Sequence, residues 1–127
     1  SNPINDQFEQ ILVRSNRSKR KSVADGLTFL IETWSKHYDV GLNKYLINNL
    51  INAIFRKRNF KAWDQNLKTF FVEAKKILQK KVEIPDQVPS FPIHAPLPRI
   101  KEILRFLEEA AEHAKKGEWN SLFEFER

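Results

Sequence analysis

The chain contains no cysteine and no methionine, and it has only three glycines. Without cysteine it can form no disulfide, carry no thiolate nucleophile and build no zinc site on sulfur ligands. This composition fits a reducing compartment, so we expect an intracellular, cytoplasmic protein, or a nuclear one if the source is eukaryotic. The missing methionine is explained either by removal of an initiator before Ser1 or by excision from a longer protein.

Long apolar runs are also absent. The first 30 residues hold no apolar stretch of signal-peptide length, and nothing approaches the roughly 18–20 apolar residues that cross a bilayer. The 127 residues are 41% hydrophobic, which is enough for one domain with a core that needs no covalent cross-link. We therefore expect a soluble, single helical domain that covers residues 1–127.

Sequence signatures of catalysis are missing as well. The histidines, His37, His94 and His113, lie far apart, and there is no H-E-x-x-H motif, serine elbow or glycine-rich phosphate loop. Glu109 and His113 are one helical turn apart and could touch a metal. A metal site in a helical bundle, however, repeats such ligands on facing helices, and the sequence offers no matching set. We predict that the protein is not an enzyme and uses no metal or other cofactor.

What the sequence does contain is helical periodicity. Apolar residues recur at spacings of three and four through five segments, most clearly from Phe60 to Leu78, and no segment alternates as a strand does. Ser22 and Asn59 are predicted N-caps, and Gly117 is a predicted helix stop. We predict an all-α fold, a bundle of four to five helices, at about residues 6–15, 22–36, 42–57, 60–81 and 99–116.

Residues 82–98 differ from the rest, because they hold five of the six prolines and no glycine. Proline fixes φ and removes an amide donor, so neither a helix nor a central strand persists in such a segment. Large apolar side chains recur through it more often than in a disordered linker. We predict a proline-rich, extended strap that packs on the bundle before the last helix, followed by an acidic, aromatic tail over residues 117–127.

The charge of the chain is unevenly distributed. The formal net charge is +6, but residues 41–82 carry ten cations against two anions, whereas residues 83–127 carry six cations against nine anions. This asymmetry favours an anionic partner or an electrostatic contact within the molecule.

The cations form clusters that could hold phosphates. Lys61, Lys68 and Lys75 are seven residues apart, so they follow one side of a helix at intervals of roughly 10 Å. Lines of cations suit phosphates, because each neutralised phosphate releases counterions. Solvation or compensation of helix dipoles is the competing interpretation. The candidate polyanion-binding residues are Arg14, Arg17, Lys19, Arg20, Lys21, Arg56, Lys57, Arg58, Lys61, Lys68 and Lys75.

Two functional hypotheses follow. The first is a non-catalytic domain that binds nucleic acid or another polyanion, such as an acidic protein surface, through phosphate contacts and without base-specific readout. Base stacking on Phe60 or Trp63 is the weaker interpretation, because aromatics at helical core spacing usually belong to the core. The alternative is a protein–protein interaction module or assembly subunit, either homo-oligomeric or a domain of a larger protein.

The surface expected for this alternative function is the aromatic tail. A contiguous, exposed apolar patch usually marks an interface, but the tail could instead dock on its own bundle. The candidate partner-binding residues are Trp119, Leu122, Phe123 and Phe125.

Overall fold

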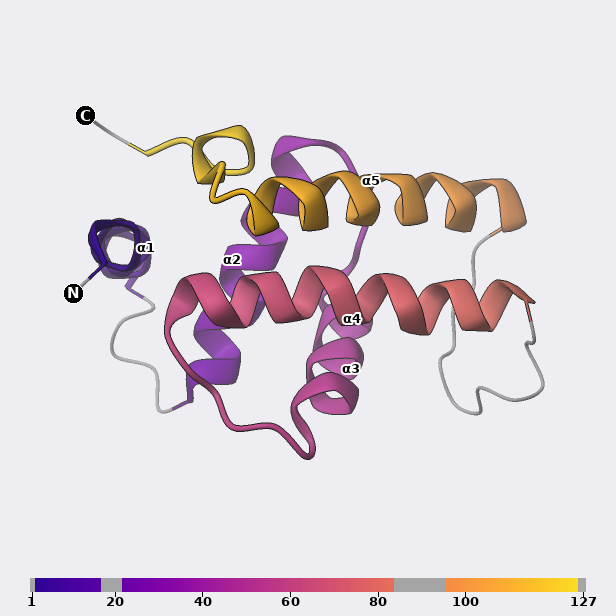
Figure 1. Ribbon diagram of the computed structural model, residues 1–127, viewed down its shortest axis with the longest axis horizontal. Coiled ribbons are helices and arrows are strands. Elements are labelled where there is room, and N and C mark those ends of the chain that lie inside the picture. The colour runs from indigo at the N-terminus through magenta and orange to yellow at the C-terminus, as the bar shows by residue number, and fades with distance from the viewer. Residues whose placement is uncertain (1, 17–21, 84–95, 126–127) are drawn as a thin grey trace.

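The computed structural model describes residues 2–16, 22–83 and 96–125. Within these ranges the protein has five α-helices and no strand, which confirms the predicted all-α fold (Figure 1). The helix bounds differ from the predicted ones by one to three residues. The helices are α1 (Pro3–Arg14), α2 (Val23–His37), α3 (Lys44–Phe55), α4 (Trp63–Glu83) and α5 (Leu97–Lys115), with a short 3₁₀ turn, η2 (Trp119–Ser121).

The proline-rich strap is only partly within the described residues. The predicted segment was 82–98, but Val82 and Glu83 belong to α4, and Leu97 and Pro98 begin α5. Proline at the first positions of a helix is tolerated because its missing N–H group has no intrahelical acceptor there. Residues 84–95, which would form the strap, lie outside the described residues.

Side-chain caps explain where several helices begin. Ser22 caps α2, as predicted, because its Oγ accepts the Ala24 amide at 3.1 Å. The Oδ1 atom of Asn43 accepts the Leu46 amide at 2.7 Å, so α3 begins two residues later than predicted. The prediction that Asn59 caps the fourth helix was wrong, because α4 begins only at Trp63.

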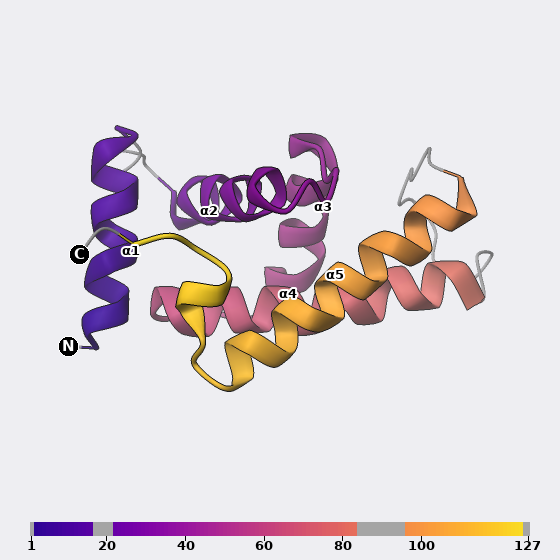
Figure 2. The same ribbon diagram turned by 90° about the horizontal axis from the view of Figure 1, so that it is seen from above.

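The core is continuous across the five helices. Helix α4 packs against each of the other four, and α5 runs back along it in the opposite direction (Figures 1 and 2). Trp34 of α2 and Phe71 of α4 meet edge to face at 4.9 Å between ring centroids, and both are fully buried. Each large apolar side chain buried in this way stabilises the fold by about 1.5–3 kcal/mol.

No described helix is long and apolar enough to cross a membrane.

The aromatic tail folds back over α1. The ring of Phe8 is fully buried and meets Trp119, Phe123 and Phe125 at 5.5, 5.1 and 5.2 Å between ring centroids. Figure 1 accordingly shows the described C-terminal segment beside α1. Gly117 ends α5 as predicted, with a positive φ of 72°.

Of the two alternatives left open for the tail, the structure shows the one in which it docks on its own bundle. Trp119, Leu122 and Phe123 are 6% exposed or less, and Phe125 is partly buried against the same core. Phe8 of the same chain contacts the three aromatic rings, and Leu122 is buried in the same core, so these side chains do not form an open apolar surface. A protein–protein interaction function stays a prediction, but this tail is not its surface.

Phe60, which was predicted to face the core, is exposed instead, and so is Tyr45. Tyr45, near the start of α3, is 64% exposed, and Phe60, between α3 and α4, is 38% exposed. Phe60 was assigned to the core because it continues the apolar spacing of the fourth helix. The structure places it before that helix begins, where the periodicity does not apply.

Candidate polyanion-binding surface

The corner between α3 and α4, residues 56–62, is held by side chains of both helices. Asn66 is buried on α4, and its Oδ1 accepts the Lys61 amide at 2.8 Å while its Nδ2 donates to the Lys61 carbonyl at 3.0 Å. Arg58 donates from Nη1 to the Ile54 carbonyl at 2.6 Å and pairs through Nη2 with Glu73 Oε1 at 2.7 Å. The backbone and one guanidinium of the corner are thus fixed before any ligand binds.

A concavity of about 530 Å³ lies on this corner and on the first turns of α4. Three cations reach it, and no carboxylate occurs among its described lining residues. Gln65 and Thr69 add an amide and a hydroxyl, which can donate hydrogen bonds to an anion. The described residues that line it are Phe55, Arg58, Asn59, Lys61, Gln65, Asn66, Lys68 and Thr69.

A second concavity, of about 510 Å³, adjoins the first through Arg58. Its described lining also lacks carboxylates and consists of Ala53, Ile54, Arg56, Lys57 and Arg58. We call the two concavities together the corner surface. Its five cations are Arg56, Lys57, Arg58, Lys61 and Lys68, all of them exposed residues.

The charges of the corner surface are only weakly compensated. Glu73 binds Arg58, and its other oxygen lies 3.1 Å from Lys76 Nζ, so this carboxylate is shared. Among the described residues, no carboxylate lies within ion-pair distance of Lys61 or Lys68. The positive charge of this region therefore remains available to a ligand.

Lys115 of α5 was not predicted to belong to this region. It lines a third depression, of about 370 Å³, together with Arg58, Lys68 and the carboxylate of Glu73. The sequence explains Lys115 as a cation at a helix C-terminus, and its proximity to Lys68 depends on how α5 packs on α4. Gln65 and Thr69 were also missed, although Gln65 lies one helical turn before both Lys68 and Thr69 on α4, which was a usable signal.

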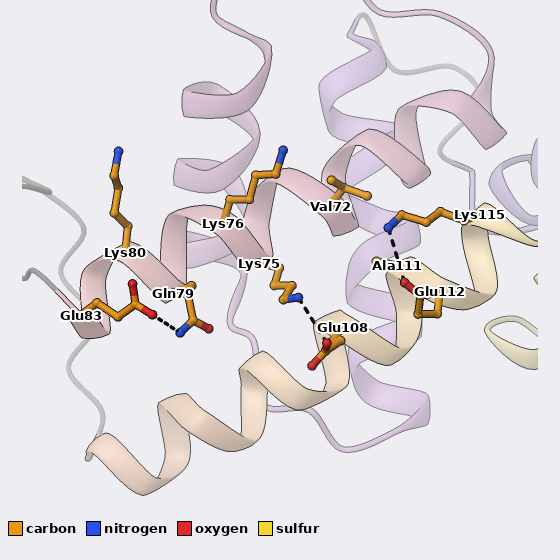
Figure 3. A pocket seen from close by; sticks show the side chains of 10 residues that line it. All are labelled: Val72, Lys75, Lys76, Gln79, Lys80, Glu83, Glu108, Ala111, Glu112 and Lys115. Atoms are coloured by element: carbon orange, nitrogen blue, oxygen red, sulfur yellow. Dashed lines mark hydrogen bonds and ion pairs between the residues drawn. The ribbon is translucent and has the colours of Figure 1, made fainter.

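Lys75, in contrast, lies in a groove of mixed charge between α4 and α5. Figure 3 shows Lys75 reaching across to Glu108, with 3.3 Å between Nζ and Oε1, and Lys115 pairing with Glu112 at 3.4 Å. Glu83 lines the same groove and accepts a hydrogen bond from Gln79. These carboxylates make the groove a poor match for a polyanion, so we exclude Lys75 from the corner surface.

Of the basic cluster that follows α1, only Arg14 lies within the described residues. The first turns of α1 contact the start of α4, through Asn2 to Asp64 and Asn5 to Asp64. Arg14 is the last residue of α1, at the opposite end of that helix (Figure 2). The other predicted members, Arg17, Lys19, Arg20 and Lys21, lie outside the described residues.

The pair Glu109 and His113 does not form part of a metal site in the described structure. His113 Nδ1 lies 3.2 Å from Glu118 Oε1, and Glu109 pairs with Arg105. In the described part of the chain, no group of three or more histidine and carboxylate side chains could hold a metal ion.

Comparisons with protein-family models, with curated proteins and with solved structures found no match to this chain. The candidate site is therefore defined by the geometry of the chain alone.

Proposed function

We propose that this protein is a non-catalytic binding domain that attaches to the phosphate backbone of a nucleic acid through the corner surface. The observation that carries this proposal is the absence of carboxylates from the described lining of two adjoining concavities that five cations reach. A phosphodiester requires such a surface, with positive charge to neutralise it and amide or hydroxyl donors to orient it. Contacts of cations with phosphates are the same for every sequence, so we propose binding without base readout.

Several simultaneous contacts are needed for useful affinity. One exposed ion pair contributes only about 0–1 kcal/mol, because water and salt screen it. Five cations on a corner whose backbone Asn66 and Arg58 already hold in place act together, and little backbone freedom is lost on binding. Most of the gain comes from released counterions, so the affinity must fall as the salt concentration rises.

The first prediction concerns the double variant Lys61→Gln/Lys68→Gln. We expect weaker binding to a labelled oligonucleotide and a salt dependence less steep by about 1.4 in the log–log slope for a single strand, since each lost phosphate contact contributes about 0.7. Fluorescence anisotropy at several salt concentrations measures both quantities.

The matched control for this prediction is Lys36→Gln/Lys44→Gln. It removes the same charge from two exposed lysines that do not line the corner surface. Equal loss in both double variants would mean that net charge, and not this surface, drives binding. No binding by the unmodified protein at low salt would overturn the proposal. Direct binding of labelled heparin, together with no binding of the oligonucleotide, would redirect the proposal to another polyanion.

A further inference from the structure

The aromatic residues of the corner differ in what they can offer a ligand. The ring of Trp63 is held between two helices: its Nε1 donates to Glu9 of α1 at 2.7 Å, and its far edge would lie 2.9 Å from a Cβ atom at Gly26 of α2. Trp63 is therefore committed to the fold. Phe60, in contrast, is 38% exposed, so part of this residue is open to a ligand.

Phe60 is not itself a lining residue of the basic concavity, but it contacts one of them. Its ring stacks on that of Phe55, with 4.7 Å between centroids and 25° between planes, and Phe55 lines the concavity. The residues on either side of Phe60, Asn59 and Lys61, line the same concavity. One face of the Phe60 ring is thus supported by a buried ring, while a third of the side chain remains open to solvent beside the cations.

The position of Phe60 sets it apart from other exposed apolar side chains. Among the described residues, the large exposed hydrophobics are Val13, Val23, Tyr38, Tyr45, Phe60 and Leu97. Of these, only Phe60 neighbours the cations of the corner surface in sequence and contacts a residue that lines it. An exposed aromatic ring beside phosphate-binding cations is how proteins hold an unpaired base.

We infer that the corner surface selects single-stranded nucleic acid, with one unpaired base stacked on Phe60 while the adjacent phosphates contact Lys61 and Lys68. This inference rests on the proposed function and narrows it to one class of nucleic acid. A base inside a duplex has both faces covered by its neighbours, so it cannot stack on Phe60 without leaving the stack. Every base has a flat face, so stacking adds affinity without sequence specificity.

The variant Phe60→Ala tests the inference. Loss of one stacked base should weaken binding to a labelled single-stranded 12-mer by about fivefold or more, since stacking contributes about 1–3 kcal/mol per base. Binding to a duplex of the same length should change by less than about twofold. Phe60→Trp should restore the single-strand affinity, and Tyr45→Ala, which removes an aromatic ring at the other end of α3, should have no effect.

The variant Phe60→Leu separates a structural role of Phe60 from a role in base stacking. Leucine still covers Phe55 but offers no flat ring, so it should fold like the unmodified protein and bind single strands as weakly as Phe60→Ala. Unchanged single-strand affinity in both Phe60→Ala and Phe60→Leu would overturn the inference. It would also be overturned if these variants lost affinity equally for the single strand and the duplex. Tighter binding of the unmodified protein to the duplex than to the single strand would overturn it as well. If Lys61→Gln/Lys68→Gln weakens binding while Phe60→Ala does not, the proposed function stands and this inference falls.

Discussion

At the scale of single residues, Asn66 links the fold to the corner surface. Its carboxamide is buried and both of its polar ends bind the backbone of Lys61. We predict that Asn66→Ala lowers the free energy of unfolding by about 1–3 kcal/mol, because two hydrogen bonds are lost at a site where water replaces them poorly. Urea unfolding followed by circular dichroism measures this change.

The control for Asn66 is Asn52, which is exposed on α3. Asn52→Ala should change the free energy of unfolding by less than about 0.5 kcal/mol, as surface substitutions usually do. A similarly small effect at Asn66 would show that the corner does not depend on this side chain. The sequence did not reveal the role of Asn66, because an asparagine within an amphipathic helix looks like an ordinary polar residue.

Two glycines show what else the sequence leaves open at this scale. Gly26 lies inside α2, where glycine weakens a helix, yet a Cβ atom there would approach Trp63 to 2.9 Å. Gly41 has a φ of 85°, and the guanidinium of Arg99 occupies the space that a Cβ atom would need. Arg99 donates to the Val40 carbonyl at 2.6 Å. Both glycines serve contacts with distant parts of the chain, which local sequence patterns do not report.

At the scale of helices, α4 begins with a cap supplied by another helix. The Oδ1 atom of Asn5 on α1 accepts the Asp64 amide at 2.9 Å. We predict that Asn5→Ala lowers the free energy of unfolding by about 1 kcal/mol, the usual cost of losing a side-chain cap. Thermal unfolding measures it, and Gln10→Ala, an exposed substitution on the same helix, is the control. An Asn5→Ala variant as stable as this control would refute the cap.

The helices themselves could be predicted well from the sequence, because each has apolar residues at the right spacing. The ends of the helices were harder to predict. The start of α4 was placed at Phe60, since Phe60 and Trp63 continue the apolar spacing, whereas the actual cap of that helix comes from α1. A cap supplied from a distant helix cannot be recognised in a local pattern. The same limit applies to Lys115, which shares a depression with Arg58 and Lys68 only through the pairing of α4 with α5.

At the scale of the whole molecule, the two most distant described segments stabilise each other. We predict that Phe8→Ala lowers the free energy of unfolding by about 3–5 kcal/mol, because it removes a fully buried ring and its three aromatic contacts. Urea unfolding followed by tryptophan fluorescence measures the loss. Val13→Ala, on the exposed side of α1, should cost less than about 0.5 kcal/mol.

The same experiment tests whether α1 and the tail belong to one cooperative unit. A single transition for Phe8→Ala, shifted to lower urea, is the expected result. A separate early transition would mean that α1 and the tail detach from an otherwise stable bundle. The sequence identified the aromatic residues of the tail as unusual but could not decide between an external and an internal partner, because Phe8 is more than one hundred residues away in the chain.

The contact of Phe8 with Trp119, Phe123 and Phe125 also affects how the protein is made. A ribosome that adds about 5–20 residues per second needs on the order of ten seconds to translate from Phe8 to Phe125. Throughout that interval the nascent chain presents the ring of Phe8 without its partners, and the bundle stays open on that side. The contacts around Phe8 therefore form only after residues 119–125 have been synthesised, and until then Phe8 is a site where a chaperone could bind the nascent chain.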